Sequence, residues 1–411
     1  MPEDHSRPAG PSAAPDFKTL YRKLESTLGR IERIENTSEM LSNVLDVLVT
    51  EFRDELGFEG GRLYERDGEE FVLCCAIGRS STARLGYRMP PDYPPHRRTL
   101  EEGFLIMGPD DPAFDEEVER SVGVDSTFAA IAVGEGKTHV FAFSVRGEIK
   151  EESILYSLSA VRHLINLKLQ QRQFVGALQE ARRIQESLLP ASPPVFEGFD
   201  IDGLSRPAET VGGDLFDYLP LSNRLLGLAI ADASGHGLPA ALLARDVITG
   251  LRMGVDEDLK VVKVIERLNR VINRAALSSA FISLFYGELD SGGGMIYCNA
   301  GQSPPLLLHD GTFHELREGG LILGPNPRAR YEKGHARIER GDTLILYTDG
   351  VTEIEKTRGV PFGVEALQRV VRRSRGGSAR EIVEAVFHAV DAYAANVPPQ
   401  DDMTVVAVRR V

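Results

Sequence analysis

Four short acidic motifs constrain the fold of this chain more than any other feature of its sequence. They are 211–214 (VGGD), 231–237 (ADASGHG), 348–350 (TDG) and 401–404 (DDMT), and most adjoin an apolar run typical of a β-strand. Any one aspartate in such a place can be a turn former or a helix cap. Together, however, they predict carboxylates gathered at strand ends, which suits a hard divalent cation such as Mg²⁺ or Mn²⁺. The pattern is typical of a two-metal phosphate-ester hydrolase.

Length, charge and cysteine content narrow the class of protein. The chain has 411 residues, which favours two or three domains, and its net charge of −14 argues against nucleic acid or an anionic membrane as the main partner. Its three cysteines are too few for a disulfide framework, which favours a reducing compartment. We find no secretory signal pattern and no run of roughly 18 to 20 apolar residues. We therefore expect a cytoplasmic protein without a membrane span.

The first part of the chain predicts a small α+β domain. Residues 1–16 are rich in Pro, Ala, Ser and Gly and are expected to form a disordered tail. The predicted domain covers residues 17–150, with helices before and after an antiparallel sheet. Apolar spacing predicts helices near 20–34 and 40–52 and strands near 62–66, 70–77, 104–107, 127–133 and 138–145.

Residues 151–190 predict a helical linker. The run from Glu151 to Leu189 contains no proline and one glycine, and Pro190 ends it. A continuous helix of this length would span roughly 55–60 Å at 1.5 Å per residue. Its heptad-like spacing predicts a coiled-coil connector that forms a homodimer, although a helix packed on the preceding domain has the same pattern. The spaced apolar residues are Ile154, Leu158, Val161 and Ile165, then Val175, Leu178 and Ala181.

Residues 195–411 predict a second α+β domain after the break at 190–194 (PASPP). Predicted strands alternate with predicted helices in hairpin-like pairs. The expected strands lie near 199–205, 214–219, 225–231, 281–288, 294–299, 304–308, 343–348 and 404–410, and the expected helices near 238–253, 258–276, 363–375 and 378–394.

The order of motifs in this second domain resembles a known family. VGGDxxD, DASGHG, NAGxxPP, GDTLxLYTDGVTE, FG and DDMTVVAV occur in the order found in bacterial SpoIIE-like serine phosphatases, within the metal-dependent PPM class. The resemblance covers about residues 195–411, and 181–190 (ARRIQESLLP) is similar to the helix that leads into such domains. It implies a PPM-type β-sandwich flanked by helices on both outer faces, with the metals at one end of the sandwich.

The resemblance also implies a role for individual residues. Asp232 corresponds to the carboxylate that bridges two Mn²⁺ or Mg²⁺ ions, and the backbone carbonyl of Ala233 would join one of them. Asp349 and Asp401 correspond to ligands of the second ion. Asp214 corresponds to a ligand or to a residue that holds metal-bound water. Two such ions would lower the pKa of a shared water, so that hydroxide attacks phosphorus directly and no covalent phosphoenzyme forms.

Five other residues leave alternatives open. Arg206 is a candidate for binding substrate phosphate, with a surface salt bridge as the alternative. His236 follows Asp232 by four residues rather than the two found in many eukaryotic relatives, so it is either a catalytic acid or a turn residue. Successive side chains along a strand point to opposite faces, so Asp402 is a poorer candidate than Asp401 for the same metal cluster. Asp217 is a candidate for a further metal, and Gln302 replaces a more usual histidine with an amide.

The N-terminal half weakly resembles a GAF-type sensor domain, which implies regulation by a small ligand or an upstream regulatory protein. By the resemblance, the substrate is a phosphorylated STAS-type anti-anti-sigma factor in a partner-switching pathway. One alternative is a non-catalytic pseudophosphatase that docks a partner through the same cleft. A diguanylate cyclase is disfavoured because Leu215 stands where its GGDEF motif needs a second acidic residue.

Overall fold

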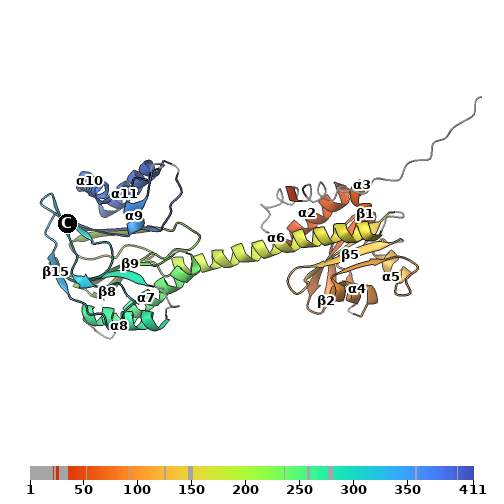
Figure 1. The fold of residues 1–411 in the computed structure, drawn as a ribbon, viewed down its shortest axis with the longest axis horizontal. Helices are drawn as coiled ribbons and strands as arrows, with labels where there is room; N and C mark the ends of the chain where they lie inside the picture. Colours follow the sequence, from red (N-terminus) through yellow and green to blue (C-terminus); the bar gives the residue numbers. More distant parts are fainter. Residues whose placement is uncertain are drawn as a thin grey trace, which may run out of the picture. The chain divides into compact units, whose positions relative to one another are not determined.

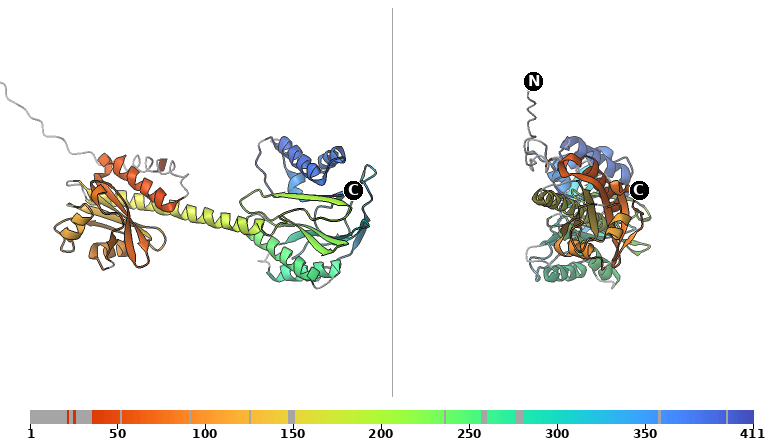
Figure 2. Two further views of the ribbon diagram at one scale, coloured as in Figure 1. Left: turned by 180° about the vertical axis from the view of Figure 1, so that it is seen from behind. Right: turned by 90° about the vertical axis from the view of Figure 1, so that its right-hand side faces the viewer.

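The computed structural model divides into two compact units, Met1–Val175 and Gly176–Val411. Figures 1 and 2 show the elements of both units. The predicted tail at residues 1–16 and most of the predicted helix near 20–34 lie outside the described residues. The structure describes residues 22, 25, 26, 36–51, 53–90, 92–124, 126–146, 151–235, 237–256, 260–275, 281–356, 359–395 and 397–411.

The N-terminal unit is built around one antiparallel sheet, as the sequence predicts. Its strand order is β3-β2-β1-β6-β5-β4. The elements are α2 (Thr37–Thr50), α3 (Arg53–Leu56), β1 (Phe58–Asp67), β2 (Glu70–Gly78), η1 (Arg79–Thr82), β3 (Arg88–Met89), α4 (Pro94–Glu102), β4 (Phe104–Met107), α5 (Glu116–Ser121), β5 (Phe128–Val133) and β6 (His139–Val145).

Both faces of this sheet are covered by helices. On one face, apolar side chains of α2 and of the long helix α6 (Glu151–Glu186) pack on β1, β5 and β6, with Leu41, Leu158 and Phe143 fully buried. On the other face, α4 and α5 cover a second core that includes Tyr93 and Phe128. The strands β5 and β6 are therefore buried along their whole length, which explains their continuous apolar sequences.

Helix α6 differs from the predicted linker in where its first half packs. Ile154, Leu158, Val161 and Ile165 lie in the core of the N-terminal unit, and the unit extends to Val175 rather than to residue 150. These four side chains are consequently not available as a seam for a second chain. The spacing of apolar residues is the same whether a helix packs on a sheet or on another helix, so the sequence could not separate these two cases.

The C-terminal unit contains two sheets. One has the order β14-β11-β10-β9-β8, with β15 paired to β11, and the other has the order β13-β12-β16-β17-β7. The elements are β7 (Phe199–Arg206), β8 (Leu215–Ser222), β9 (Leu225–Ala233), α7 (Leu238–Asp256), α8 (Val261–Ala275), β10 (Ile282–Asp290), β11 (Gly294–Ala300), β12 (Leu306–His309), β13 (Thr312–Glu315), β14 (Gly319–Gly320), β15 (Gly334–Arg337), β16 (Thr343–Tyr347), α9 (Asp349–Glu353), α10 (Val364–Ser374), α11 (Ala379–Ala394) and β17 (Met403–Arg410).

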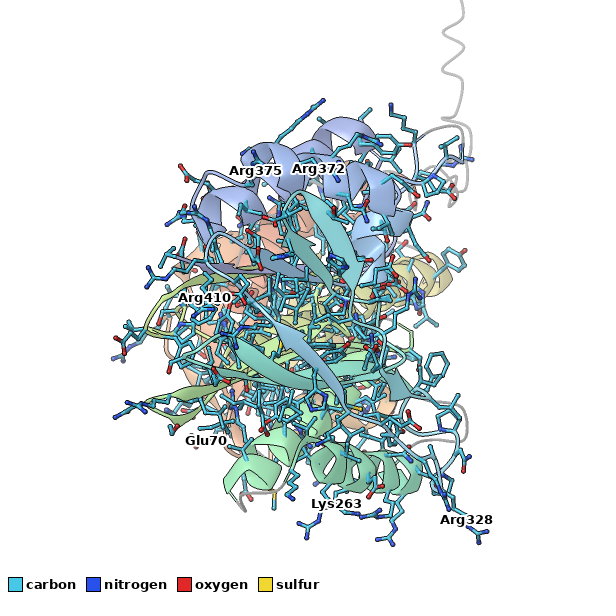
Figure 3. All side chains as sticks on the ribbon, turned by 90° about the vertical axis from the view of Figure 1, so that its left-hand side faces the viewer. Glu70, Lys263, Arg328, Arg372, Arg375 and Arg410 are labelled. Carbon is cyan, nitrogen blue, oxygen red and sulfur yellow. The ribbon has the colours of Figure 1, made fainter. Side chains whose placement is uncertain are left out.

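The two sheets form a sandwich with helices on both outer faces. Side chains such as Ile230, Phe285 and Val406 from the two sheets share one core. Helices α7 and α8 pack on the outer face of the first sheet, and α10 and α11 on that of the second. Figure 3 shows the consequence for the surface: Arg372 and Arg375 lie on one flank of this unit and Lys263 on the opposite flank. The predicted β-sandwich flanked by helices is confirmed.

The long elements were predicted to within a few residues, whereas several short ones were not. The helices α4 and α5 and the two- to four-residue strands β3, β14 and β15 had no counterpart in the prediction. Their sequences are short and largely polar, so no apolar period marks them. In the part of the chain that the structure describes, no helix is both long enough and apolar enough to span a bilayer.

Candidate metal centre

Asp214 is held inside the C-terminal unit by two threonine hydroxyls. The Oγ1 atoms of Thr348 and Thr404 each donate a hydrogen bond of 2.7 Å to its Oδ2. The side chain is 3% exposed, and its Oδ1 is buried without a hydrogen-bond partner. Burial, followed by the charge of nearby Asp232, raises its pKa well above the ordinary value, and the two hydroxyls oppose this shift. One carboxylate oxygen is thus fixed and the other is left open to a cation.

Asp232 lies at the end of β9, in the centre of a cluster of carboxylates. Its half-buried side chain has a pKa raised from 3.8 to about 7, first because of burial and then because of Asp349, Asp401, Asp402 and Glu353. Glu353, in α9, has a raised pKa for the same reasons. Like charges held this close repel one another unless a proton or a cation intervenes. The cluster therefore has the electrostatics of a cation site.

Strand pairing brings the third and fourth motifs together. The strands β16 and β17 are antiparallel, with Tyr347 opposite Val405. Just beyond this pair, the Thr348 amide donates to the Thr404 carbonyl at 3.1 Å, and the Thr404 amide donates to Thr348 Oγ1 at 2.9 Å. Asp349 begins α9 directly after this junction. Segments more than fifty residues apart in sequence thus meet at one end of the sandwich.

Asp402, one of the carboxylates that act on Asp232, also fixes the loop of the first motif. It is 3% exposed and accepts hydrogen bonds from the backbone amides of Ala208 (2.7 Å) and Gly213. Its carboxylate lies so close to Gly212 that a Cβ atom at that position would overlap it. Asp401 is exposed, and its Oδ1 accepts the Asp402 amide at 2.8 Å. The predicted role of Asp401 as the metal ligand of the two stays a prediction.

Ala233 lies against the same loop through its backbone. Its amide donates to the Gly213 carbonyl at 3.3 Å. A Cβ atom at Gly213 would come within 2.8 Å of the Ala233 carbonyl oxygen, so only glycine permits this approach. The carbonyl assigned by resemblance to a metal therefore lies beside the VGGD loop.

Gln302 connects the two sheets next to the carboxylate cluster. Its buried amide accepts a hydrogen bond from Ser283 Oγ on β10 and donates one of 3.2 Å to the Tyr347 carbonyl on β16. Ser283 Oγ also lies 3.3 Å from the Asp232 carbonyl, to which it donates. Asn299 holds the Gln302 backbone through its own side chain. The Gln302 amide thus ties the two sheets together beside Asp232.

Two other predicted candidates, Arg206 and Asp217, form ion pairs with neighbouring side chains. Arg206 is bound to Asp391 on α11 at 3.0 Å, and its guanidinium carbon lies 4.2 Å from the centre of the Phe387 ring. Its phosphate-binding role stays a prediction, which would require this pair to open. Asp217 is buried and paired with Arg252 of α7 at 2.9 Å, which gives it a structural partner. His236 lies outside the described residues.

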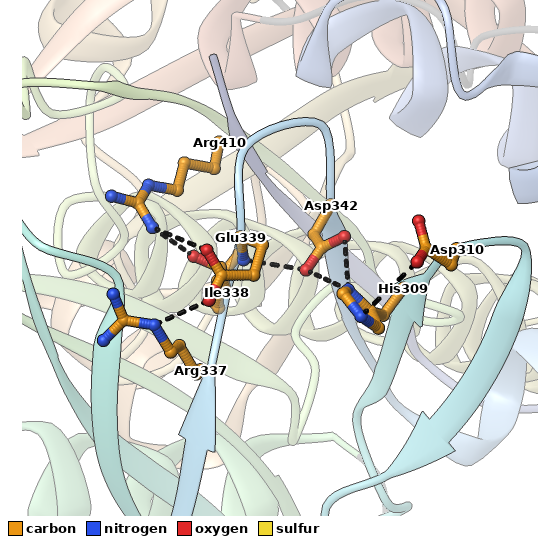
Figure 4. Close-up of polar contacts among 7 residues, drawn as sticks. All are labelled: His309, Asp310, Arg337, Ile338, Glu339, Asp342 and Arg410. Carbon is orange, nitrogen blue, oxygen red and sulfur yellow. Dashed lines mark hydrogen bonds and ion pairs between the residues drawn. The ribbon is translucent and has the colours of Figure 1, made fainter.

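A second polar cluster, at the opposite end of β16 and β17 from the acidic motifs, is explained by local structure. His309 Nδ1 lies 3.0 Å from both carboxylate oxygens of Asp342, and Asp342 also accepts the Glu339 amide at 2.7 Å (Figure 4). Arg410 donates to the Ile338 carbonyl at 2.7 Å in the same group. The bonds to Asp342 raise the pKa of His309. This cluster fastens the turn before β16.

The donor set of the carboxylate cluster fits a hydrated divalent ion. Among the residues that the structure describes, no three His, Cys, Asp or Glu side chains are close enough together to hold an ion by themselves. Mg²⁺ keeps several of its waters and is usually bound through one or two carboxylates. The open Asp214 Oδ1 and the repulsion centred on Asp232 match that mode of binding.

Comparison with known proteins agrees with this fold. Residues 222–411 match the family model described as Stage II sporulation protein E (SpoIIE). Phosphoserine phosphatase RsbU of Bacillus subtilis (strain 168) is 28% identical over 243 residues, which cover 58% of this chain and 72% of RsbU. Phosphoserine phosphatase RsbP of the same organism is 28% identical over 182 residues, 43% of this chain and 45% of RsbP. This chain thus spans less than half of RsbP.

A solved structure shows the same fold. The SiaA-PP2C domain of Pseudomonas aeruginosa superposes with a TM-score of 0.52 at 20% identity, covering 58% of this chain and 98% of that domain. The C-terminal unit therefore has the PP2C fold. Residues 222–411 form a SpoIIE-type phosphatase domain that is homologous to the serine phosphatases RsbU and RsbP.

Proposed function

We propose that this chain is a metal-dependent protein serine/threonine phosphatase that uses two Mn²⁺ or Mg²⁺ ions. The observation that carries the proposal is the carboxylate cluster around Asp232, together with the open, buried Asp214 Oδ1. Asp214, Asp232, Asp349 and Asp401, with the carbonyl of Ala233, would hold the ions. When bound, such ions activate water and neutralise charge on the phosphoryl group.

The chain's own residues would keep this site in order. Thr348 and Thr404 bind one oxygen of Asp214, so that its other oxygen would be available to an ion. Asp402 holds the VGGD loop through two backbone amides, and Gln302 ties the two sheets beside it. These contacts supply preorganisation, because the carboxylates need not move when charge develops.

The substrate would be a phosphorylated STAS-type protein, whose dephosphorylation switches partners in the control of a sigma factor. The SpoIIE-like order of motifs and the phosphoserine phosphatases RsbU and RsbP among the relatives support this class of substrate. A phosphorylated STAS-domain protein should be hydrolysed with a higher kcat/KM than a short phosphoserine peptide. Equal rates for the two would contradict the proposed substrate.

The N-terminal unit would regulate this activity as a GAF-like sensor. A cavity of about 30 Å³, room for a polar occupant about the size of a water molecule, lies between the sheet and α4. The buried ion pair between Arg62 and Glu119 (3.5 Å) lines it, together with His96. Arg62 Nε, Glu119 Oε2 and His96 Nε2 are buried there without hydrogen-bond partners. Such atoms require a polar companion.

The chain would also form a homodimer through the second half of α6. Phe174, Val175 and Ile184 are 45–66% exposed on this helix, although they are apolar. A second copy of the helix would cover them. Sedimentation analysis should therefore show a dimer that Phe174→Glu dissociates, and a monomeric wild-type chain would contradict this part of the proposal.

The experiment that tests the enzyme measures phosphate release from a phosphoserine protein in Mn²⁺ and in EDTA. Wild type should be active in Mn²⁺ alone, Asp349→Asn should be inactive, and the control Asp310→Asn, whose side chain is 94% exposed, should match wild type. Activity that survives in Asp349→Asn would contradict the proposed site. A chain that binds Mn²⁺ and a phosphoprotein without hydrolysis would instead be the pseudophosphatase.

A further inference from the structure

The last turn of helix α6 contacts the metal-site loop directly. The Gln185 side chain donates from Nε2 to the Gly212 carbonyl and accepts at Oε1 from the Gly212 amide at 3.0 Å. A side-chain amide thereby satisfies both backbone groups of one loop residue, as a neighbouring strand would. Gln185 is 27 residues from Gly212 in sequence, so the contact is tertiary.

Gly212 lies in the loop whose backbone conformation determines the position of Asp214. The next residue, Gly213, donates its amide to Asp402, and the residue after that is Asp214, whose Oδ1 is open. The loop is glycine-rich and would have many accessible conformations without such bonds. Gln185 and Asp402 hold it at successive amides, so that the backbone leading into Asp214 is fixed.

A second contact ties the segment after α6 to the other side of the site. The Leu188 carbonyl accepts a hydrogen bond of 3.1 Å from Arg252 in α7, the helix that follows the Asp232 loop. Arg252 also pairs with Asp217 on β8, three residues after Asp214. The end of α6 thus touches the elements on both sides of the carboxylate cluster. These hydrogen bonds couple the position of the end of α6 to the geometry of the carboxylate cluster.

We propose that Gln185 is a positioning residue, through which helix α6 holds the VGGD loop in its metal-binding conformation. This inference rests on the proposed metal-dependent function and adds a residue that none of the four acidic motifs contains. Helix α6 begins in the core of the N-terminal unit. A shift of its last turn would break the bonds to Gly212 and loosen Asp214. The two hydrogen bonds between Gln185 and Gly212 would therefore transmit such a shift to the carboxylates.

Two variants and one matched control test this role in the full-length chain. Gln185→Ala removes both bonds. Gln185→Glu keeps the size and the acceptor, but places an oxygen against the Gly212 carbonyl. Gln179→Ala changes an exposed glutamine on the same helix and should behave like wild type. A residue that served only as packing bulk would tolerate the glutamate.

The first readout is hydrogen exchange of peptides covering residues 211–214 in EDTA, which requires neither metal nor activity. Both Gln185 variants should exchange roughly tenfold faster there than wild type, while peptides from β17 remain unchanged. The second readout is calorimetric titration with Mn²⁺ alone. The dissociation constant should rise about tenfold, because a loop that must first order binds more weakly.

Wild-type exchange at 211–214 in Gln185→Ala, or wild-type behaviour of Gln185→Glu in both readouts, would overturn the inference. These results are separable from failure of the proposed function. If the chain hydrolyses no phosphoprotein but exchange and Mn²⁺ affinity change as expected, the positioning role of Gln185 is supported and the phosphatase assignment fails. If the chain is an active phosphatase and neither readout changes, only the positioning role of Gln185 is wrong.

Discussion

Replacing Asp232 with asparagine should stabilise the metal-free protein. The pKa of Asp232 is raised from 3.8 to about 7, so ionising it in the folded chain costs free energy. Each pKa unit corresponds to about 1.36 kcal/mol, which sets an upper limit of about 4 kcal/mol. Because the side chain is only half-buried and solvent screens part of this repulsion, we expect about 2 kcal/mol.

The pH dependence gives the sign of this effect. A carboxyl group whose pKa is raised by folding costs nothing where it is protonated in both states, below about pH 4. The cost grows as the pH rises and is complete above pH 7, where the folded group is also ionised. The gain from Asp232→Asn should therefore be larger at pH 8 than at pH 5.

Urea unfolding in EDTA, followed by pulsed hydrogen exchange of β9 and β17, measures this gain in the C-terminal unit. At a typical slope of about 2 kcal/mol per molar, the midpoint should rise by about 1 M at pH 8. The control Asp310→Asn should leave it unchanged, since that side chain is 94% exposed. An unchanged or lower midpoint for Asp232→Asn at pH 8 would refute the reasoning that carboxylates repel one another there.

Three further predictions concern the supporting residues. Thr404→Val, which removes one of the two hydroxyl bonds to Asp214, should weaken Mn²⁺ binding about tenfold in calorimetry, whereas Thr404→Ser should retain it; equal losses would exclude the hydroxyl as the cause. Asp402→Asn cannot accept two amides as a carboxylate does, so it should cost about 1–3 kcal/mol and speed hydrogen exchange at residues 208–213; unchanged exchange would contradict this. Because Asp342 raises the pKa of His309, that pair stabilises the chain below pH 6.5 and loses its effect as the pH rises through the raised pKa. His309→Gln should flatten this part of the urea-midpoint profile, and a profile with the wild-type slope would show that the pair adds nothing.

The sandwich could be predicted because its strands carry a strong local signal. β9, β16 and β17 are buried along most of their length, so their sequences are continuous apolar runs. The aspartates of the motifs mark where these runs end, which located Asp232, Asp349 and Asp401 at one edge. The carboxylate cluster follows from strand pairing, because antiparallel β16 and β17 bring two of the motifs together.

The contacts that organise the site could not be predicted, because the sequence does not show which residues meet in the folded chain. Thr348 and Thr404 lie within the acidic motifs, yet Asp214, to which both donate, is 134 and 190 residues away. Gln185 lies in a segment whose sequence predicts a helical linker but gives no contact for this side chain. Its role depends on where that helix ends relative to Gly212. Such pairings arise from tertiary structure, and local patterns carry no signal for them.

The destination of α6 was ambiguous for a related reason. Ile154 and Leu158 have the spacing of a coiled coil, and they fill the core of the N-terminal unit instead. The interaction of the helix with a sheet and with a second helix requires the same apolar stripe. Only the presence of an unfilled sheet face decides between them.

The central claim is that the four acidic motifs form one divalent-cation site that supports hydrolysis. Calorimetric titration of the full-length chain with Mn²⁺, with phosphoprotein hydrolysis measured on the same samples, tests it most directly. We predict binding of two ions in wild type and loss of both binding and turnover in Asp349→Asn, with Asp310→Asn unchanged. Full Mn²⁺ binding and turnover in Asp349→Asn would contradict the claim.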